Sequence, residues 1–480
     1  MKLKTIAAAL ALAALAGCAS APRQAPLALA QPAPAIQGAA PKNIIFFLGD
    51  GMGITTLTAA RIYAVGEEGM LPIDQLPESA FVKTYSNNAQ VTDSAAAMSA
   101  LMTGVKVNNN VVGMSTDTSA VYPAKDANGN SQVSACKDGK PVRNLLELAK
   151  ARGMGTGVVT TTRITDATPA ATYAHACHRK MENDIAAQLV PGGAGFNPAL
   201  GDGVDVLFGG GLQFFTPHAK GGARADNRDL LGELRARGYT VASASADLAQ
   251  PAARMVGLFA PADMSFDAVR DPAKEPSLKQ MTEAAIDVLA KKPSGFFLMV
   301  EGGRIDHALH ATLGKRALQE TVAFNDALKA AIDRMQALDP GLKNTLIVAT
   351  ADHDHTLLLN GYARRTGPTT ASEPGVIGII KSVEDGKPLR DMDGAPFTII
   401  GFGNGENRVA GSRGDAPHLT DAAAAGDEYH QEATVRVKPG RETHGGIDVY
   451  LGATGARAET FRGTIENTRV FELIKAAAQW

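Results

Sequence analysis

Short apolar runs alternate with amphipathic segments along most of the chain, a pattern typical of strands and helices that follow one another. Continuous apolar runs predict buried strands at residues 43–48, 156–161, 204–208, 296–300 and 346–350. Apolar positions three or four residues apart predict helices at 143–152, 228–237, 277–292 and 314–338. The third of these opens with the Ser–x–x–Gln spacing of a capping box. This order predicts an α/β fold with a central, largely parallel sheet flanked by helices on both faces.

The pattern changes between about residues 357 and 440, which are rich in Gly, Pro, Arg and Asp. This segment contains one clear strand-like run, at 397–402, and has no long helical pattern. We interpret it as a subdomain inserted into the α/β core. The core pattern returns with a strand-like run at 447–451 and ends with a helical segment at 466–478.

The N-terminus differs from this globular pattern. Two lysines precede an apolar run from Ile6 to Leu15, and small residues follow up to Cys18. A charged start, a short apolar run and small residues are typical of a secretory signal, and the run is too short to span a membrane permanently. Because its end resembles a bacterial lipobox, we predict a signal peptide at 1–18 that leaves Cys18 as a lipid anchor. The alternative is an ordinary signal cleaved after residues 19–21.

Residues 19–41 are rich in Ala, Pro and Gln, a composition that favours a flexible linker, so the α/β domain is expected at 42–480. Signal and linker together predict export to the cell envelope of a bacterium, with a periplasmic protein attached to the membrane through Cys18. Cys136 and Cys177 would then lie in an oxidising compartment. A disulfide between them is plausible, and two free buried thiols are the alternative.

The charge of the chain excludes some functions. Charged residues make up 20% of the sequence and the formal net charge is −2. Without a basic excess, nothing indicates a nucleic-acid binding domain or binding to an anionic membrane surface. An anionic ligand would have to be attracted by a local site.

Acidic residues follow the predicted strands near the points where these strands end. Asp50, Glu301 and Asp352 each come within two residues of the end of a strand-like run. In open α/β sheets the ligand crevice lies beyond the carboxyl ends of the strands. We therefore expect these three side chains to converge in space.

Histidines accompany two of these acidic residues. Asp306 and His310 are four residues apart and share one face if their segment is helical, and His353 directly follows Asp352. Such carboxylates and imidazoles without thiolates suit Zn²⁺, and an all-oxygen subset suits Mg²⁺. Taken alone, either cluster could be an exposed polar turn or a solvated loop.

Two further residues are candidates for chemistry on a phosphate group. Ser94 heads a run of small residues, where Asp93 and Ser94 could simply begin a helix. No histidine lies near Ser94 in the sequence, so a nucleophilic role would need an activating group from elsewhere. Arg179 could bind a phosphate with its planar fork, and the alternative is an arginine on a helix surface.

Seven spaced motifs resemble, in order, those of alkaline phosphatases. The resemblance covers about residues 42–480, and the segment 361–446 is similar to the crown-like insert that lies near the dimer interface of the animal enzymes. The motifs are Asp50 in its strand–turn, 92–96, 166–169, Arg179, 301–310, 352–355 and His444.

The resemblance implies a hydrolase of phosphate monoesters that forms a phosphoserine at Ser94, releases inorganic phosphate and binds two Zn²⁺ and one Mg²⁺. It matches Arg179 to the phosphate-binding arginine and implies a homodimer. The implied ligands of one zinc are Asp306, His310 and His444, those of the second are Asp50, Asp352 and His353, and those of magnesium are Asp50, Thr168 and Glu301.

The residues around these ligands combine two patterns of the family. Asp93 would orient Arg179, and Asp166 and His307 would lie just outside the ligands. The position of His307 is a lysine in some enterobacterial members, and that of Asp166 is a histidine in the animal enzymes. His175 and His355 match positions near the metals that are not expected to be ligands.

Three other functions are alternatives to a phosphate monoesterase. A phosphodiesterase on the same metal scaffold would need room for a second ester group. Sulfatase relatives use Cys or Ser in a C/S-x-P-x-R context, which residues 94–98 lack. A metal-storing lipoprotein would not need Ser94 and Arg179 together with the ligands.

Overall fold

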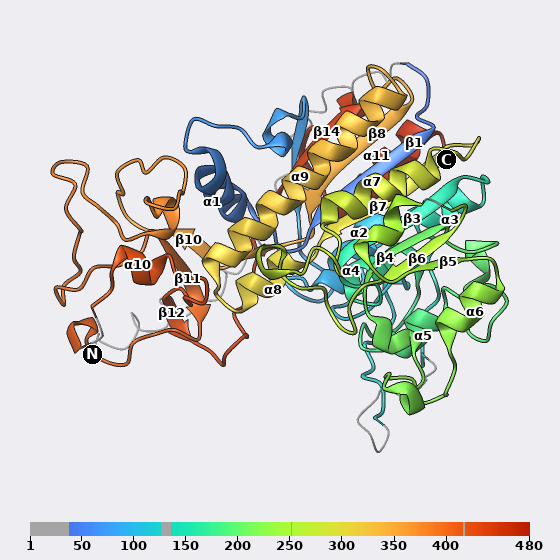
Figure 1. The fold of residues 1–480 in the computed structure, drawn as a ribbon, viewed down its shortest axis with the longest axis horizontal. Helices are drawn as coiled ribbons and strands as arrows, with labels where there is room; N and C mark the ends of the chain where they lie inside the picture. Colours follow the sequence, from blue (N-terminus) through green and yellow to red (C-terminus); the bar gives the residue numbers. More distant parts are fainter. Residues whose placement is uncertain (1–37, 126–135, 251, 416–417) are drawn as a thin grey trace, which may run out of the picture. The chain divides into compact units, whose positions relative to one another are not determined.

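A ten-stranded sheet forms the core of the domain (Figure 1). The computed structural model describes residues 38–125, 136–250, 252–415 and 418–480, all within one compact unit. The strands lie in the order β15-β2-β14-β8-β1-β7-β3-β4-β6-β5. They are β1 Asn43–Gly49, β2 Glu78–Lys83, β3 Gly155–Arg163, β4 Val206–Gly210, β5 Thr240–Ala242, β6 Met255–Leu258, β7 Phe296–Gly302, β8 Thr345–Ala351, β14 Val449–Gly455 and β15 Gly463–Glu466.

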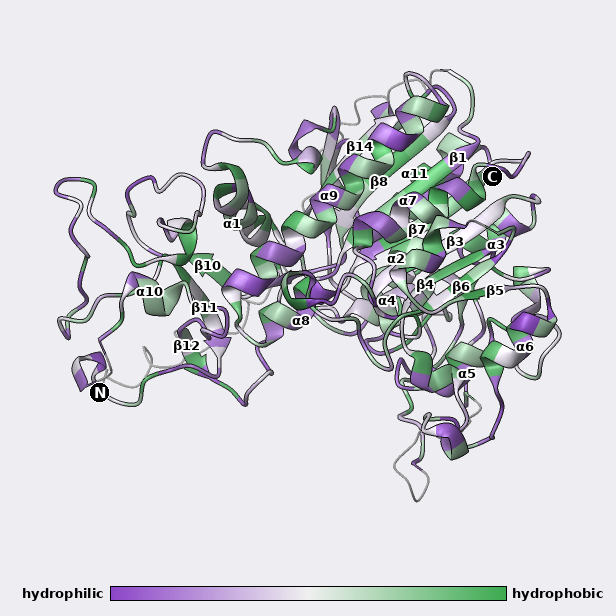
Figure 2. Cartoon of the chain, viewed as in Figure 1, coloured by the Kyte–Doolittle hydropathy of each residue, from purple (hydrophilic) through white to green (hydrophobic). Residues whose placement is uncertain are grey.

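The sheet is largely parallel, as predicted. Only β14 runs against its neighbours β8 and β2. The central strands β1, β7 and β8 contain almost no exposed side chain, and they are largely green, hydrophobic, in Figure 2. Parallel strands of this kind must be covered on both faces, which explains their continuous apolar runs.

Helices cover both faces of the sheet. On one face the ring of Phe47 in β1 meets Phe324 of α9, with centroids 5.8 Å apart. On the other face Phe297 of β7 packs against Trp480, which follows α11, at 6.4 Å. The α-helices are α1 Ile54–Val65, α2 Ser94–Thr103, α3 Leu145–Lys150, α4 Ala167–Tyr173, α5 Glu182–Ala187, α6 Leu230–Ala236, α7 Leu278–Leu289, α8 Arg304–His310, α9 Gly314–Leu338, α10 Asp421–Ala424 and α11 Asn467–Ala478.

The predicted elements are present, with differences at their ends. Helix α7 begins after the capping residue Ser277, as predicted, but ends at Leu289 rather than 292. The strand predicted at 397–402 is displaced, because β11 spans Ile400–Gly405 and Thr398 forms an isolated bridge. Strands β2, β5, β6 and β15 were not predicted from the sequence. All four are short, and β2, β5 and β15 contain exposed positions, so they lack a continuous apolar run.

The segment predicted as an insert has its own small sheet. Strands β10 Leu357–Leu359, β11 and β12 Ala433–Arg436 form this three-stranded sheet. At its base, β9 Asp354–His355 pairs with β13 His444–Gly445 in an antiparallel ladder. The insert therefore leaves and rejoins the core through two paired strands that both carry candidate site residues.

The predicted signal peptide with Cys18, and nearly all of the predicted linker, lie outside the described residues. Within the described ranges no helix combines the length and apolar character needed to cross a membrane.

The disulfide considered from the sequence is present. Cys136 and Cys177 are bonded, with their Cα atoms 5.6 Å apart. The bond closes a loop with a sequence separation of 41 residues onto the segment that leads to Arg179.

Replacing both Cys136 and Cys177 with serine should lower the free energy of unfolding by about 2–4 kcal/mol, because the unfolded chain regains the entropy of an open loop. Urea denaturation under oxidising conditions measures this loss. A reductant should destabilise the wild-type protein by a similar amount and leave the double variant unchanged. Equal midpoints for the wild type with and without reductant would contradict the prediction.

Candidate functional site

The candidate site lies where β8, β1 and β7, neighbours in the sheet, reach their carboxyl ends. Asp50 follows β1, Glu301 lies near the end of β7, and Asp352 follows β8, and all three are buried. The backbone N–H of Gly51 donates to Asp352 Oδ1 at 3.0 Å. The hydroxyl of Thr168, in α4, donates to Asp50 Oδ2 at 3.1 Å. The convergence expected from the strand ends is confirmed.

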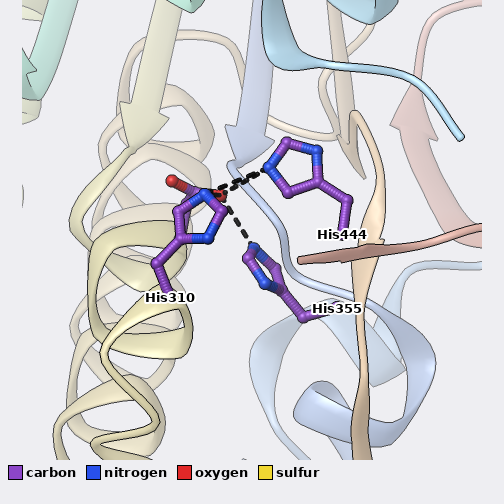
Figure 3. A group of neighbouring side chains, drawn as sticks. His310, His355 and His444 are labelled. Carbon is purple, nitrogen blue, oxygen red and sulfur yellow. Dashed lines mark hydrogen bonds and ion pairs between the residues drawn. The ribbon is translucent and has the colours of Figure 1, made fainter. Parts of the chain in front are cut away.

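Three imidazoles from separate segments surround the carboxylate of Asp306 (Figure 3). His310 lies one helical turn after Asp306 in α8, as its spacing predicted, whereas His355 and His444 come from β9 and β13. The Nε2 atoms of His310 and His444 each lie 3.4 Å from Asp306 Oδ1, and that of His355 lies at 2.7 Å.

Hydrogen bonds fix the tautomers of two of these imidazoles. His444 Nδ1 lies 2.8 Å from the carbonyl oxygen of Thr92, and His310 Nδ1 contacts the carbonyl oxygen of Glu442. Since a carbonyl only accepts, each Nδ1 must carry the proton, which leaves the Nε2 lone pair directed at the cluster. Neutral imidazoles held by backbone carbonyls in this way are typical metal ligands.

His355 is bound differently, because both of its nitrogens face carboxylates. Its Nδ1 lies 2.6 Å from Glu442 Oε2, and its Nε2 faces Asp306. Burial alone would lower the pKa of His355, but the negative charges of Glu442 and Asp306 raise it to about 10. A protonated His355 donates twice and orients Asp306, consistent with its exclusion from the expected ligands.

The second group joins Asp50 and His353 to Asp306. His353 Nε2 lies 3.3 Å from both Asp50 Oδ1 and Asp352 Oδ2. Burial holds the pKa of His353 well below its usual value. Burial and the neighbouring carboxylates raise the pKa of Asp50 well above its usual value, and burial raises that of Asp352 to about 6. The group is thus short of positive charge.

The buried carboxylate oxygens Asp352 Oδ2 and Glu301 Oε1 are among those that accept no hydrogen bond in the part of the chain that is described. Burial raises the pKa of Glu301 to about 8, although Thr160 and Thr162 donate to its other oxygen. Unpaired buried carboxylates are costly unless a cation satisfies them. The nitrogen-containing groups fit Zn²⁺, and the oxygens of Asp50, Thr168 and Glu301 fit Mg²⁺.

Ser94 is the first residue of α2, and Asp93 is its N-cap, as the sequence indicated. The Ser94 side chain is buried, and its Oγ lies 3.3 Å from His353 Nε2 and 3.5 Å from Asp50 Oδ1. The residues that reach the Ser94 hydroxyl are therefore candidate metal ligands. The N-terminus of α2 also favours negative charge at this position.

Arg179 lies between α4 and α5 and reaches the same helix end. Its Nη1 donates to Asp93 Oδ2 at 3.1 Å, and its Nη2 donates to Asp166 Oδ1 at 3.2 Å. Its Nε, also buried, has no partner among the described residues. The guanidinium thus keeps donors free for an anion beside Ser94.

Asp166 and His307 lie together beside Arg179, within a network that the sequence did not indicate. Asp166 is the N-cap of α4, and its other oxygen pairs with Arg163 at 2.9 Å. Arg304 Nη1 lies 2.7 Å from His307 Nδ1. Because a guanidinium only donates, Nδ1 of this histidine must accept, and its ring proton lies on Nε2. The side chains of Asp166, Asp263 and His307 lie close enough to hold a cation. Both carboxylates already have arginine partners, however: Arg163 pairs with each of them, Arg179 with Asp166 and Arg304 with Asp263.

Comparison with known proteins agrees with this geometry. A family model described as alkaline phosphatase matches residues 41–480. The tissue-nonspecific alkaline phosphatase of Rattus norvegicus is 34% identical over 472 residues, covering 89% of this chain and 82% of the rat protein. The alkaline phosphatase of Gadus morhua is 34% identical over 470 residues and covers 91% of each chain.

Solved structures show the same fold. The alkaline phosphatase of Thermus thermophilus superimposes with a TM-score of 0.65 at 24% identity, covering 95% of each chain. A mutant of TAB5 alkaline phosphatase with Mg bound in its M3 site has a TM-score of 0.64 at 25% identity, and covers 92% of this chain and 99% of its own.

Removing divalent cations should make stability fall as pH rises. The pKa values of Asp352, Glu301 and His355 are raised, to about 6, 8 and 10. A raised folded-state pKa favours folding while the proton is bound, so the benefit is lost as pH passes from the ordinary value through the raised one. Asp352 loses most of this benefit as pH rises to about 6, whereas Glu301 and His355 lose most of it between about pH 6 and pH 9. The chelated protein should therefore melt at least roughly 5 °C lower at about pH 9 than at about pH 6.

Metal reloading provides the control for this melting experiment. Zn²⁺ with Mg²⁺ should raise the melting temperature more at the higher pH, because the ligands bind metal in their deprotonated forms. A chelated protein equally stable at both pH values would contradict the assignment of these groups.

Proposed function

This chain belongs to the alkaline phosphatase family and is a metal-dependent phosphatase, and on that basis we propose that it hydrolyses phosphate monoesters through a phosphoserine at Ser94. One observation carries the proposal. The hydroxyl of Ser94 lies within 3.5 Å of Asp50 and His353, while Arg179 is held against the N-cap of the same helix.

Two zinc ions and one magnesium complete the proposed site. Asp306, His310 and His444 would hold one zinc, and Asp50, Asp352 and His353 the other. Asp50, Thr168 and Glu301 would hold magnesium. When bound, Zn²⁺ supplies the Lewis acidity that lowers the pKa of a coordinated hydroxyl group and stabilises negative charge on oxygen.

In the proposed reaction, the Ser94 hydroxyl loses its proton to solvent and its oxygen attacks the phosphorus in line. A bond between Ser94 Oγ and phosphorus forms as the bond to the alcohol oxygen breaks, and that oxygen takes up a proton from solvent and leaves as the alcohol. Water then attacks the phosphoserine, which releases inorganic phosphate and regenerates Ser94. Arg179 donates N–H groups to the phosphoryl oxygens, and such positioning and electrostatic stabilisation supply most of the rate in phosphoryl transfer.

We also propose that the chain is an exported, lipid-anchored protein of a bacterial envelope that forms a homodimer. The lipobox-like end of residues 1–18 and the linker composition of 19–41 support the anchor. The homodimer rests on family resemblance, including the insert between β9 and β13.

Hydrolysis of p-nitrophenyl phosphate at alkaline pH should require both the metals and Ser94. Chelation should abolish phosphate release, and Zn²⁺ with Mg²⁺ should restore it. Ser94→Ala should lower kcat at least about 10³-fold, because it removes the nucleophile. Ser99→Ala, a buried serine on the same helix, is the matched control. Full activity of Ser94→Ala, or activity in the presence of chelator, would refute the mechanism.

Comparison of p-nitrophenyl phosphate with bis-p-nitrophenyl phosphate distinguishes the two ester classes. We expect the larger kcat/KM for the monoester, with metal content measured on the same sample. A larger kcat/KM for the diester would overturn the monoesterase proposal in favour of a phosphodiesterase.

Labelling of expressing bacteria with palmitate tests the anchor. The wild-type chain should incorporate the label and remain with membranes, whereas Cys18→Ser should lose both properties. Label in the Cys18→Ser protein would refute attachment at this residue.

A further inference from the structure

A tight turn beside α2 contains a non-glycine residue in the left-handed region. The Val111 N–H donates to the carbonyl oxygen of Asn108 at 3.1 Å, which closes a turn over Asn109 and Asn110. Asn110 has φ 74°. A positive φ at the third position is typical of a type II turn, where Gly and Asn are favoured. The third asparagine of the run 108–110 therefore occupies a position that few other residues tolerate.

Both backbone groups of Asn110 reach residues of the proposed site. Its N–H donates to Asp93 Oδ1 at 3.0 Å, and its carbonyl oxygen accepts from the N–H of Arg179 at 2.7 Å. Asp93 in turn accepts from Arg179 Nη1 through its second oxygen. Asn110, Asp93 and Arg179 thus form a closed ring of hydrogen bonds.

The turn itself is held from two sides. Asn109 donates through its backbone to Asn88 at 2.9 Å and through its side chain to the Val91 carbonyl at 3.2 Å. On the other side, Val112 and Ala176 exchange two backbone hydrogen bonds of 2.9 Å. The side chain of Asn110, by contrast, has no hydrogen-bond partner among the residues described.

We propose that Asn110 is a positioning residue, whose left-handed backbone holds the Asp93 cap and the Arg179 guanidinium in the geometry that binds phosphate. The proposal rests on the assignment of Arg179 as the phosphate-binding arginine. Its physical basis is that the backbone dihedral angles of Asn110 set the orientation of its N–H, which donates to Asp93, relative to its carbonyl, which accepts from Arg179. A negative φ at this position would turn the N–H and the carbonyl away from one of these partners.

Substitutions at Asn110 separate its backbone from its side chain. Asn110→Gly keeps the left-handed conformation, whereas Asn110→Val disfavours it because of branching at Cβ. With metal-loaded enzyme, Asn110→Val should raise the inhibition constant and the calorimetric Kd of inorganic phosphate about tenfold, a loss of about 1.4 kcal/mol. Asn110→Gly should stay within about twofold of wild type, and Asn110→Ala should fall between them.

Asn227 provides a matched control, since it is exposed and also left-handed, with φ 56°. Asn227→Val should affect the melting temperature at most and leave the phosphate Kd unchanged. Equal weakening by Asn110→Gly and Asn110→Val would overturn the proposal, because the side chain would then be responsible. If Asn110→Val does not fold, Asn110→Gly and Asn110→Ala provide the same test. The Gly variant should have the lower phosphate Kd, and equal Kd values for the two variants would overturn the proposal.

Arg179→Ala separates this proposal from the proposed function. We expect Arg179→Ala to weaken phosphate binding, and Asn110→Val to add less than about twofold in that background, because interacting residues are not additive. If Arg179→Ala leaves the phosphate Kd unchanged, the assignment of Arg179 is wrong. If Arg179→Ala weakens binding but a folded Asn110→Val does not, only the positioning role of Asn110 is wrong.

Discussion

The burial of several carboxylates against one another is the constraint on which the rest of the site depends. Asp50, Glu301 and Asp352 lie at adjacent strand ends, and burial raises the pKa of each. Each would cost folding free energy if it were ionised without a positive partner. Parallel strands make this arrangement unavoidable, because their carboxyl ends meet at one edge. Cations at this edge would offset the charge of these carboxylates and would be the largest local charges of the site.

Beside these carboxylates lies a second group of buried carboxylates, which do have positively charged partners. Arg163 and Arg179 both pair with Asp166, and although burial alone would raise the pKa of Asp166, their charges hold it far below its usual value. Helix α2 joins the two halves, because Ser94 faces the carboxylates and imidazoles while its cap Asp93 holds Arg179. Ser94 thus lies between the buried carboxylates at the strand ends and the guanidinium of Arg179.

The residues at strand ends could be predicted from the sequence, whereas the contacts made by loops could not. Apolar runs locate β1, β7 and β8, and position in a parallel sheet then implies that Asp50, Glu301 and Asp352 meet. The i, i+4 spacing likewise predicts one face for Asp306 and His310. Nothing local links Arg163 with Asp263, 100 residues later, or gives Asn110 its left-handed φ. Both depend on tertiary contacts that bring distant backbone segments together.

The two strands at the base of the insert explain how so distant a residue as His444 joins the site. β9 follows Asp352 and His353 directly, and its pairing with β13 sets His355 opposite His444 in register. Glu442, two residues before His444, accepts a hydrogen bond from His355, and His444 Nδ1 donates to the carbonyl oxygen of Thr92, two residues before Ser94. The return from the insert into the core therefore brings both the imidazole of His444 and the carboxylate that contacts His355 to the site. Displacement of this ladder would disturb the cluster around Asp306 and the segment before Ser94 together, because the same histidine contacts both.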